Sequence, residues 1–319
     1  MEHRTLGKTA MSVSILGYGA SPLGNEFGET DAEEGIRSVH CAIDLGINYF
    51  DVSPYYGRTL AEERLGEALS GKRDRVYLAT KCGRYGLDVE SCDYSARRVT
   101  RSIDESLSRL KTDHVDLLQV HDIEFGSSEQ IINETIPALR KIQQTGKARF
   151  IGITALPLRM LRHVASHAGV DVILSYCRYN LMVTDLDDIL TPFCREHGIG
   201  LINASPLHMR VLTDKGAPDW HPAPSEVKEA GRKVAALCAD ADVSISDVAM
   251  RFCLDHPYVA TTLVGMSKQR HVEQNIKALE FVNDAELLSR IEEIIEPVKN
   301  VMWHSGRSEN TDQHWAKGL

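Results

Sequence analysis

The feature that most restricts the fold of this chain is a regular alternation of short apolar runs with longer amphipathic stretches, beginning near residue 13. Eight of the runs have the length and composition of buried strands. The predicted strands are Ser14–Tyr18, Asn48–Asp51, Val76–Thr80, Val115–Val120, Ala148–Gly152, Asp171–Leu174, Gly200–Asn203 and Thr261–Val264. Helix-patterned stretches lie between them, the clearest being Glu33–Leu45, Ser95–Arg109, Glu129–Gln144 and Asp185–His197.

Eight strand–helix units in series predict a parallel sheet, and eight is the number of strands that closes a (β/α)8 TIM barrel. An open doubly wound sheet is the alternative, but it normally has fewer strands and an early Gly-x-Gly-x-x-Gly turn. Gly17-Tyr18-Gly19 is followed by Ala20 and Ser21 and does not give that fingerprint. The prediction is therefore a single α/β barrel domain spanning residues 1–319.

Three segments fall outside the strand–helix repeat. His3–Leu6 and Ser12–Ser14 flank Gly7-Lys8 and predict an N-terminal hairpin that closes one end of the barrel. Residues 216–224 contain three prolines and a tryptophan, which is typical of a long loop, here after the seventh strand. Residues 298–319 are polar and irregular and are expected to form a C-terminal tail.

Composition excludes several classes of function. A formal charge of −9 argues against nucleic acid or an anionic membrane as the main partner. No apolar run approaches the roughly 18–20 residues that span a bilayer, and the N-terminus has no apolar signal region. Seven scattered cysteines form no Cys-x-x-Cys pair, so neither a zinc site nor a disulfide framework is predicted. A cytoplasmic protein without a metal, acting on a small molecule, is the expectation; its oligomeric state stays open.

Polar residues follow three consecutive predicted strands, where a barrel of this type carries its reactive groups. Asp51 ends the second strand and Tyr56 lies in the loop after it; Lys81 ends the third strand and His121 the fourth. Taken singly, three of the four are more often structural, since an Asp caps a turn, a Tyr packs and a Lys is solvated, while a His at a strand end is equally often a core residue or a site residue. Together on neighbouring strand ends, they predict a catalytic cluster.

Proton transfer to or from an alcohol or carbonyl oxygen is the chemistry that this cluster suggests. A free tyrosine has a pKa of ~10, too high for efficient work near neutral pH. The Lys81 ammonium beside the phenol is expected to lower the pKa of Tyr56, while Asp51 keeps Lys81 charged and in place. His121 would orient the substrate oxygen or share the proton.

These residues resemble the tetrad of the aldo-keto reductase family. The pattern Asp51-x4-Tyr56-Gly57, then Thr80-Lys81, then His121, is similar to that family in order and spacing, and the resemblance extends from the hairpin to about Val282. It implies the (β/α)8 barrel, a nicotinamide cofactor extended over the barrel mouth, and Tyr56 as the acid–base. A narrower resemblance, in Ser53–Gly57 and His121–Gly126 among other stretches, is to aldose 1-dehydrogenases. It implies NAD-dependent oxidation of an L-aldose, L-galactose or a close relative, at C1 to the lactone.

The same resemblance implies the cofactor-binding positions. The expected contacts are Thr154, Ser175, Tyr176, Ser205, Leu207, Gly265, Ser267, His271, Gln274 and Asn275. Family members that prefer NADP hold its 2′-phosphate with basic side chains, but two of those positions here are Ser267 and His271. A neutral histidine is a poor phosphate partner compared with a guanidinium, so NAD is favoured over NADP. Ala204 stands where many members stack a tyrosine on the nicotinamide.

A sugar requires hydrogen-bonding partners and an apolar face. The candidates around the mouth are Tyr55, Arg84, Asp122, Trp220 and His221. Trp220 could stack on the pyranose or equally serve an oligomer contact. Two other functions stay open: an NADPH-dependent reductase of aldehydes or ketones, and a cofactor-sensing regulatory subunit.

Overall fold

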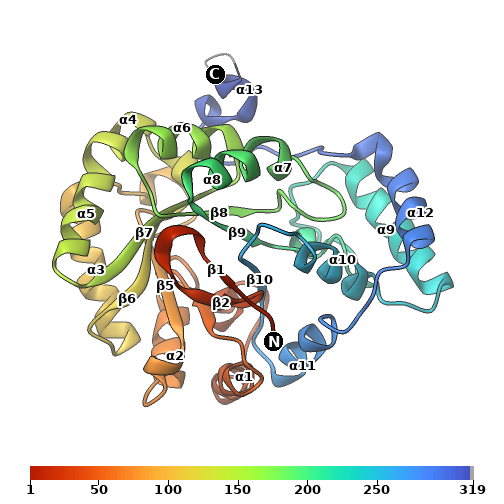
Figure 1. The fold of residues 1–319 in the computed structure, drawn as a ribbon, viewed down its shortest axis with the longest axis horizontal. Coiled ribbons are helices and arrows are strands. Elements are labelled where there is room, and N and C mark those ends of the chain that lie inside the picture. The colour runs from red at the N-terminus through yellow and green to blue at the C-terminus, as the bar shows by residue number, and fades with distance from the viewer. Residues whose placement is uncertain (317–319) are drawn as a thin grey trace.

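Eight parallel strands close into a barrel in a computed structural model that describes residues 1–316 (Figure 1). Neighbouring strands follow the order of the chain around the barrel, and β10 pairs with β3 to complete it. The barrel strands are β3 (Leu16–Gly19), β4 (Tyr49–Asp51), β5 (Tyr77–Cys82), β6 (Val115–Val120), β7 (Ala148–Ala155), β8 (Val172–Tyr176), β9 (Gly200–Ala204) and β10 (Thr261–Gly265). The predicted (β/α)8 fold is confirmed.

Six barrel strands, all but β4 and β6, continue one to three residues beyond their predicted ends. The backbone ladder runs on where the apolar run has already stopped: Thr154 pairs with Leu174 and Ser175 with Asn203. Consequently Thr154, Ser175 and Tyr176 lie within strands and not in the loops after them. Side chains of a strand alternate between the two faces of the sheet, so the directions of these three side chains are fixed more rigidly than those of loop residues.

Helices surround the barrel and follow its strands (Figure 1). The longer ones are α1 (Ala32–Asp44), α2 (Leu60–Ala68), α3 (Ala96–Leu110), α5 (Ile136–Gln144), α6 (Leu158–Ala168), α8 (Thr191–His197), α9 (Ser225–Asp240), α10 (Ile245–Leu254), α11 (Gln269–Lys277) and α12 (Ala285–Ile295). The short ones are α4 (Ser128–Gln130), α7 (Leu186–Ile189) and α13 (Asp312–Trp315).

Helix α3 illustrates how the sequence specifies these elements. The Ser95 side chain accepts a hydrogen bond from the Arg98 amide at the N-terminus, and the helix ends where Lys111 adopts a left-handed conformation. Its buried side chains include Val99 and Ile103, as the spacing predicts. The predicted helix 185–197 is instead divided into α7 and α8, with Pro192 in the first turn of α8. Proline has no amide hydrogen, so the ladder is interrupted there.

The N-terminal hairpin closes one end of the barrel, as predicted. Strands β1 (His3–Thr5) and β2 (Ser12–Ser14) pair antiparallel, and Leu6 between them is fully buried. The Lys8 amide bonds to the Gly198 carbonyl, just before β9 begins, so the hairpin covers the amino-terminal end of the strands. The carboxyl end therefore remains as the mouth.

The predicted tail is folded against the barrel over its described part. We call residues 303–316 the C-terminal segment; it contains α13, which lies beside α6 (Figure 1). The Arg307 amide donates to the Glu124 carbonyl at 3.0 Å, and Asp312 pairs with the buried Arg178. Residues 317–319 lie outside the described part. None of the described helices could span a membrane.

Candidate active site at the barrel mouth

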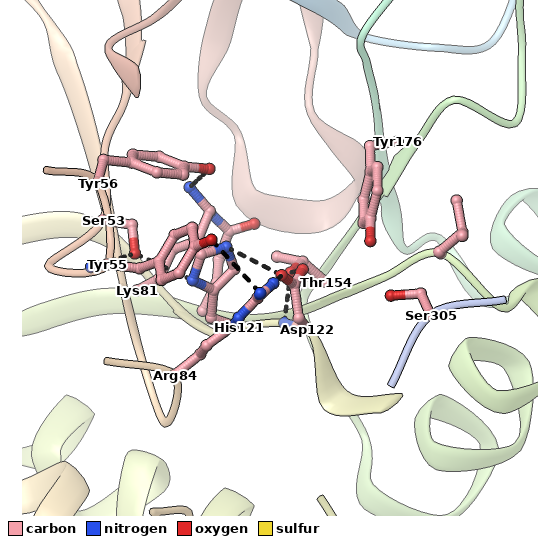
Figure 2. Close-up of polar contacts among 12 residues, drawn as sticks. Ser53, Tyr55, Tyr56, Lys81, Arg84, His121, Asp122, Thr154, Tyr176 and Ser305 are labelled. Atoms are coloured by element: carbon pink, nitrogen blue, oxygen red, sulfur yellow. Dashed lines mark hydrogen bonds and ion pairs between the residues drawn. The ribbon is translucent and has the colours of Figure 1, made fainter. Parts of the chain in front are cut away.

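The four residues of the predicted tetrad meet at the carboxyl end of β4, β5 and β6. Lys81 Nζ donates to Asp51 Oδ1 and to the Val52 carbonyl (2.9 Å), and lies 3.4 Å from the Tyr56 hydroxyl. The ring of His121 stands edge-on to that of Tyr56, with centroids 5.6 Å apart (Figure 2). Lys81, Asp51 and His121 are all buried. The structure thus brings the tetrad together as one cluster.

Burial and pairing determine the charges of the cluster. Burial raises the pKa of Asp51, although Lys81 and the Gln119 amide, which donates to Asp51 Oδ2 at 2.9 Å, oppose this. Burial would lower the pKa of Lys81, but the Asp51 charge and Tyr56 raise it above its usual value. The lysine ammonium is therefore held beside the phenol by a buried carboxylate.

The expected lowering of the Tyr56 pKa is wrong for this structure. Burial of the phenol outweighs the nearby Lys81 charge and raises the pKa of Tyr56 to about 12. The free energy of hydration that the phenolate form would lose on burial exceeds the stabilisation from the single Lys81 cation at 3.4 Å. Tyr56 is thus a neutral phenol in this structure, and it must lose its proton before it can act as a base.

His121 is neutral and fixed in orientation. Burial lowers the pKa of His121 to about 3, and its Nδ1 lies 3.0 Å from the Ser53 hydroxyl. Its Nε2 is 3.6 Å from Asp122 Oδ2. A neutral imidazole can donate a hydrogen bond to a substrate oxygen without adding a charge.

Three of the five predicted substrate contacts lie beside this cluster. Arg84 bonds to Asp122 Oδ2, and its guanidinium stacks 4.3 Å above the Tyr55 ring and 4.1 Å from Phe125 (Figure 2). Burial opposes ionisation of Asp122, but the cationic neighbours, Arg84 among them, hold its pKa below its usual value. Asp122 also has a left-handed backbone (φ 45°), and its amide donates to the Thr154 hydroxyl at 2.9 Å.

Trp220 and His221 are arranged differently from the prediction. Trp220 is 53% exposed and stacks on Phe27, with ring centroids 6.3 Å apart. His221 is buried, with Nε2 at 3.1 Å from the His208 carbonyl and Nδ1 accepting from the Ala223 amide. Because the loop uses both of its nitrogens, His221 is not available to a sugar, and its predicted contact is a misassignment. Trp303 of the C-terminal segment packs edge-on against His221.

The predicted cofactor residues lie at the carboxyl ends of β7, β8 and β10 and in the loops and helix after β9 and β10. Ser175 Oγ and Asn203 Oδ1 are buried and have no hydrogen-bond partner among the described residues. The Thr154 hydroxyl is instead engaged with Asp122, and the Tyr176 hydroxyl donates to Glu124 at 3.1 Å. Buried polar atoms without partners are costly, and a carboxamide would satisfy them.

The loops after β9 and β10 supply groups that fit the rest of a dinucleotide. Ser205 has a left-handed backbone (φ 60°), and Leu207 follows it in the same loop. Gly265 ends β10, Ser267 is buried, and α11 begins at Gln269 without an acidic residue or a side-chain cap in its first turn. Free amides at a helix N-terminus bind phosphate. The described residues therefore fit a nicotinamide dinucleotide.

Helix α11 also carries His271, one of the two positions on which the predicted preference for NAD over NADP rests. His271 is half-buried, and burial, with Arg270 and Lys268 nearby, lowers its pKa. Lys268 Nζ lies 3.7 Å from Glu34 Oε2. Asn275 is half-buried and Gln274 exposed on the same helix.

Sequence reasoning missed five residues that shape this site. They are Ser53, Gln119, Glu124, Trp303 and Ser305. Gln119 carried a usable signal, since it is a polar residue near the carboxyl end of the strand Val115–Val120, directly before Val120 and His121. Nothing in the sequence placed Ser305 near Glu124, because 181 positions separate them.

Comparison with known proteins agrees with this geometry. The chain is 48% identical to L-galactose dehydrogenase from Arabidopsis thaliana over 97% of its length and 99% of the relative's. It is 30% identical to D-threo-aldose 1-dehydrogenase from a Pseudomonas species, over 83% of this chain and 89% of that one. The holo form of aldo-keto reductase AKR11C1 from Bacillus halodurans superposes with a TM-score of 0.78 at 27% identity, covering 97% of this chain and all of that one. The family model described as "Aldo/keto reductase family" matches residues 15–296. With the barrel, the mouth and these matches together, the chain belongs to the aldo/keto reductase family.

Proposed function

We propose that this protein oxidises an L-aldose, L-galactose or a close relative, at C1 to the sugar lactone with NAD. The observation that carries the proposal is the 48% identity to an L-galactose dehydrogenase over nearly the whole of both chains. The tetrad supports it, because the cluster has a proton-transfer group, a cation and a neutral hydrogen-bond donor around one point.

The proposed mechanism assigns one task to each residue. The C1 hydroxyl of the sugar lies between the Tyr56 hydroxyl and His121, and Tyr56 accepts its proton as the C1 carbonyl forms. Bound NAD supplies the hydride acceptor for C1. Lys81 stabilises the phenolate that must form first, and Asp51 holds Lys81 charged. His121 donates a hydrogen bond to the reacting oxygen and fixes its position.

NAD, and not NADP, is the proposed cofactor. A neutral His271 offers little to a dianionic 2′-phosphate, and Lys268 is directed to Glu34. Ser175 and Thr154 would meet the carboxamide, and Tyr176 would lie where the carboxamide and the sugar adjoin. Ser205, Leu207, Gly265 and Ser267 would follow the diphosphate, and Gln274 and Asn275 would contact the adenine. Tyr55, Arg84 and Asp122 would bind sugar hydroxyls, and Trp220 would enclose the mouth.

The test is the initial rate of NADH formation with a panel of L- and D-aldoses, repeated with NADP. We expect turnover of L-galactose or a close relative, and at least about tenfold higher kcat/KM with NAD. Reduction of aldehydes by NADPH without oxidation of any aldose would refute the proposal and favour the reductase. Tight cofactor binding with neither reaction would favour a sensing subunit.

A further inference from the structure

Glu124 is a buried carboxyl group at the barrel mouth for which the mechanism above has no task. It lies in the loop after β6, two residues beyond Asp122, and its side chain has no exposed surface. Its Oε1 accepts three hydrogen bonds: from the Leu156 amide (3.2 Å), the Tyr176 hydroxyl (3.1 Å) and the Ser305 hydroxyl (3.1 Å). These donors come from three distant parts of the chain.

The backbone around Glu124 holds the C-terminal segment in addition. The Glu124 carbonyl accepts from the Arg307 amide at 3.0 Å and from the Asn310 side chain at 2.9 Å. Gly306 has a left-handed backbone, and a Cβ there would lie 2.4 Å from the Glu124 carbonyl oxygen. The segment thus approaches the loop after β6 as closely as glycine permits.

Tyr176 and Ser305 lie on the opposite side of the mouth from the proposed sugar-binding residues Tyr55 and Arg84. Figure 2 shows them on one side of the site, with Tyr55 and Arg84 on the other side and Asp122 between. Each hydroxyl donates its hydrogen to Glu124, so its oxygen lone pairs remain to accept from a sugar hydroxyl. This side of the mouth therefore offers acceptors, whereas Arg84 on the other side offers donors.

We propose that Glu124 is a positioning residue of the substrate pocket, which holds Tyr176 and Ser305 as the wall opposite Arg84. The proposal rests on the sugar substrate of the proposed function for the identity of the ligand, but the positioning itself does not depend on it.

The charge of Glu124 is consistent with this task. Burial and the neighbouring Asp122 charge raise the pKa of Glu124 to about 8, so the group is mostly neutral at neutral pH. The two carboxyl groups of this loop therefore differ in protonation state: Asp122 is ionised and pairs with Arg84, whereas Glu124 is a neutral hydrogen-bond acceptor. A glutamine has the same shape and the same acceptor oxygen, which makes Glu124→Gln the conservative variant.

The test compares Glu124→Ala and Glu124→Gln with the parent by steady-state kinetics and by amide hydrogen exchange in residues 303–310. We expect Glu124→Ala to raise the KM for the aldose about tenfold, with kcat within about threefold, and to speed exchange in the segment. Glu124→Gln should restore both to within about twofold of the parent. Ser305→Ala should raise KM, but add nothing to Glu124→Ala, since the two act through one contact.

Two matched controls separate positioning from general damage. Glu62 is also a fully buried glutamate, but it bonds to Thr80 and Arg109 away from the mouth, so Glu62→Ala should lower stability without raising KM. Ser308 lies in the same segment, and its hydroxyl meets only the exposed Glu309, so Ser308→Ala should change neither readout.

The outcomes are distinct. If amide exchange in residues 303–310 were unchanged in Glu124→Ala, Glu124 would not be a positioning residue. If exchange changed but the KM for the aldose did not, Tyr176 and Ser305 would not form a wall of the substrate pocket. If Glu124→Gln were as impaired as Glu124→Ala, the ionised carboxylate would be the active form and the proposal would fail. A parent protein that oxidises no aldose would refute the proposed function, while the exchange result would still decide the role of Glu124.

Discussion

The two sides of the barrel mouth differ in how far the fold itself bonds the polar side chains that face a ligand. On the side formed by β4 to β6, Asp51, Lys81 and His121 are each bonded to a neighbouring side chain, although Gln119 Oε1 is buried without a partner among the described residues. On the side formed by β8 and β9, Ser175 Oγ and Asn203 Oδ1 are buried without a partner among the described residues. The tetrad side chains on the first side are held in place by the fold alone, whereas on the second side a hydroxyl and an amide oxygen are left for a ligand to bond.

This difference has an energetic meaning. A buried ion pair that is fully bonded is costly to break from one side, because the remaining charge is left unpaired. A buried hydroxyl without a partner already carries its desolvation cost in the folded protein. Removing it should therefore change stability little and should weaken only the binding of a ligand that bonds to it. Substitutions on the two sides should therefore affect different quantities, and the following predictions test that contrast.

The largest effect is expected from Tyr56→Phe. Removing the hydroxyl eliminates the acid–base without disturbing the cofactor side, so kcat should fall about 10³-fold while the Kd for NAD stays within about twofold. Steady-state rates and calorimetric titration of NAD would measure the two quantities. A rate within about tenfold of the parent would refute the role of Tyr56.

The next effect is expected from Asp51→Asn, which leaves the Lys81 ammonium buried beside a neutral amide. We expect the free energy of unfolding to fall by about 3 kcal/mol and kcat to fall about 10²-fold. Chemical denaturation with the aldose assay checks both. Unchanged stability would mean that the ion pair is not what organises this side of the mouth.

The pH dependence of aldose oxidation should follow Tyr56. Its pKa of about 12 is raised by burial, so the phenolate fraction is small at neutral pH and grows as pH rises. Below that pKa the fraction of base increases about tenfold per pH unit, so the rate should rise between about pH 6 and about pH 9. The ratio of the parent rate to that of Tyr56→Phe should rise over this range, and a flat ratio would contradict the assignment.

His271→Arg should act on the cofactor side. A guanidinium can bind a 2′-phosphate in two-pronged fashion where the neutral imidazole cannot, so the kcat/KM ratio of NADP to NAD should rise about tenfold. Lys268→Arg is the matched control, because that side chain is directed to Glu34 and should change the ratio little. Equal effects of the two would argue against His271 as the determinant.

The smallest effect is expected from Ser175→Ala. Loss of an unpartnered hydroxyl should leave the thermal unfolding midpoint unchanged or slightly higher, and raise the Kd for NAD about fivefold. Calorimetry and differential scanning measurements check this. A marked loss of stability would show that Ser175 has a partner within the fold, and would remove the contrast between the two sides.

Periodicity in the sequence was sufficient for the fold and the tetrad, for a physical reason. A parallel barrel places the carboxyl ends of all its strands at one face. Asp51, Lys81 and His121 therefore had to lie close together once the strands were recognised. The sequence could not give the pKa of Tyr56, because the desolvation of a phenol depends on what covers it and not on its neighbour in the motif.

Only the tertiary structure decided the far wall of the mouth. The polar composition of 298–319 predicted a tail, yet Ser305 reaches Glu124 and Trp303 packs against His221. Likewise, His221 turns into its own loop while Trp220 meets Phe27. Contacts of this kind join residues that are far apart in the chain and follow no period, so local sequence determined the frame and the catalytic cluster, and long-range packing determined the pocket.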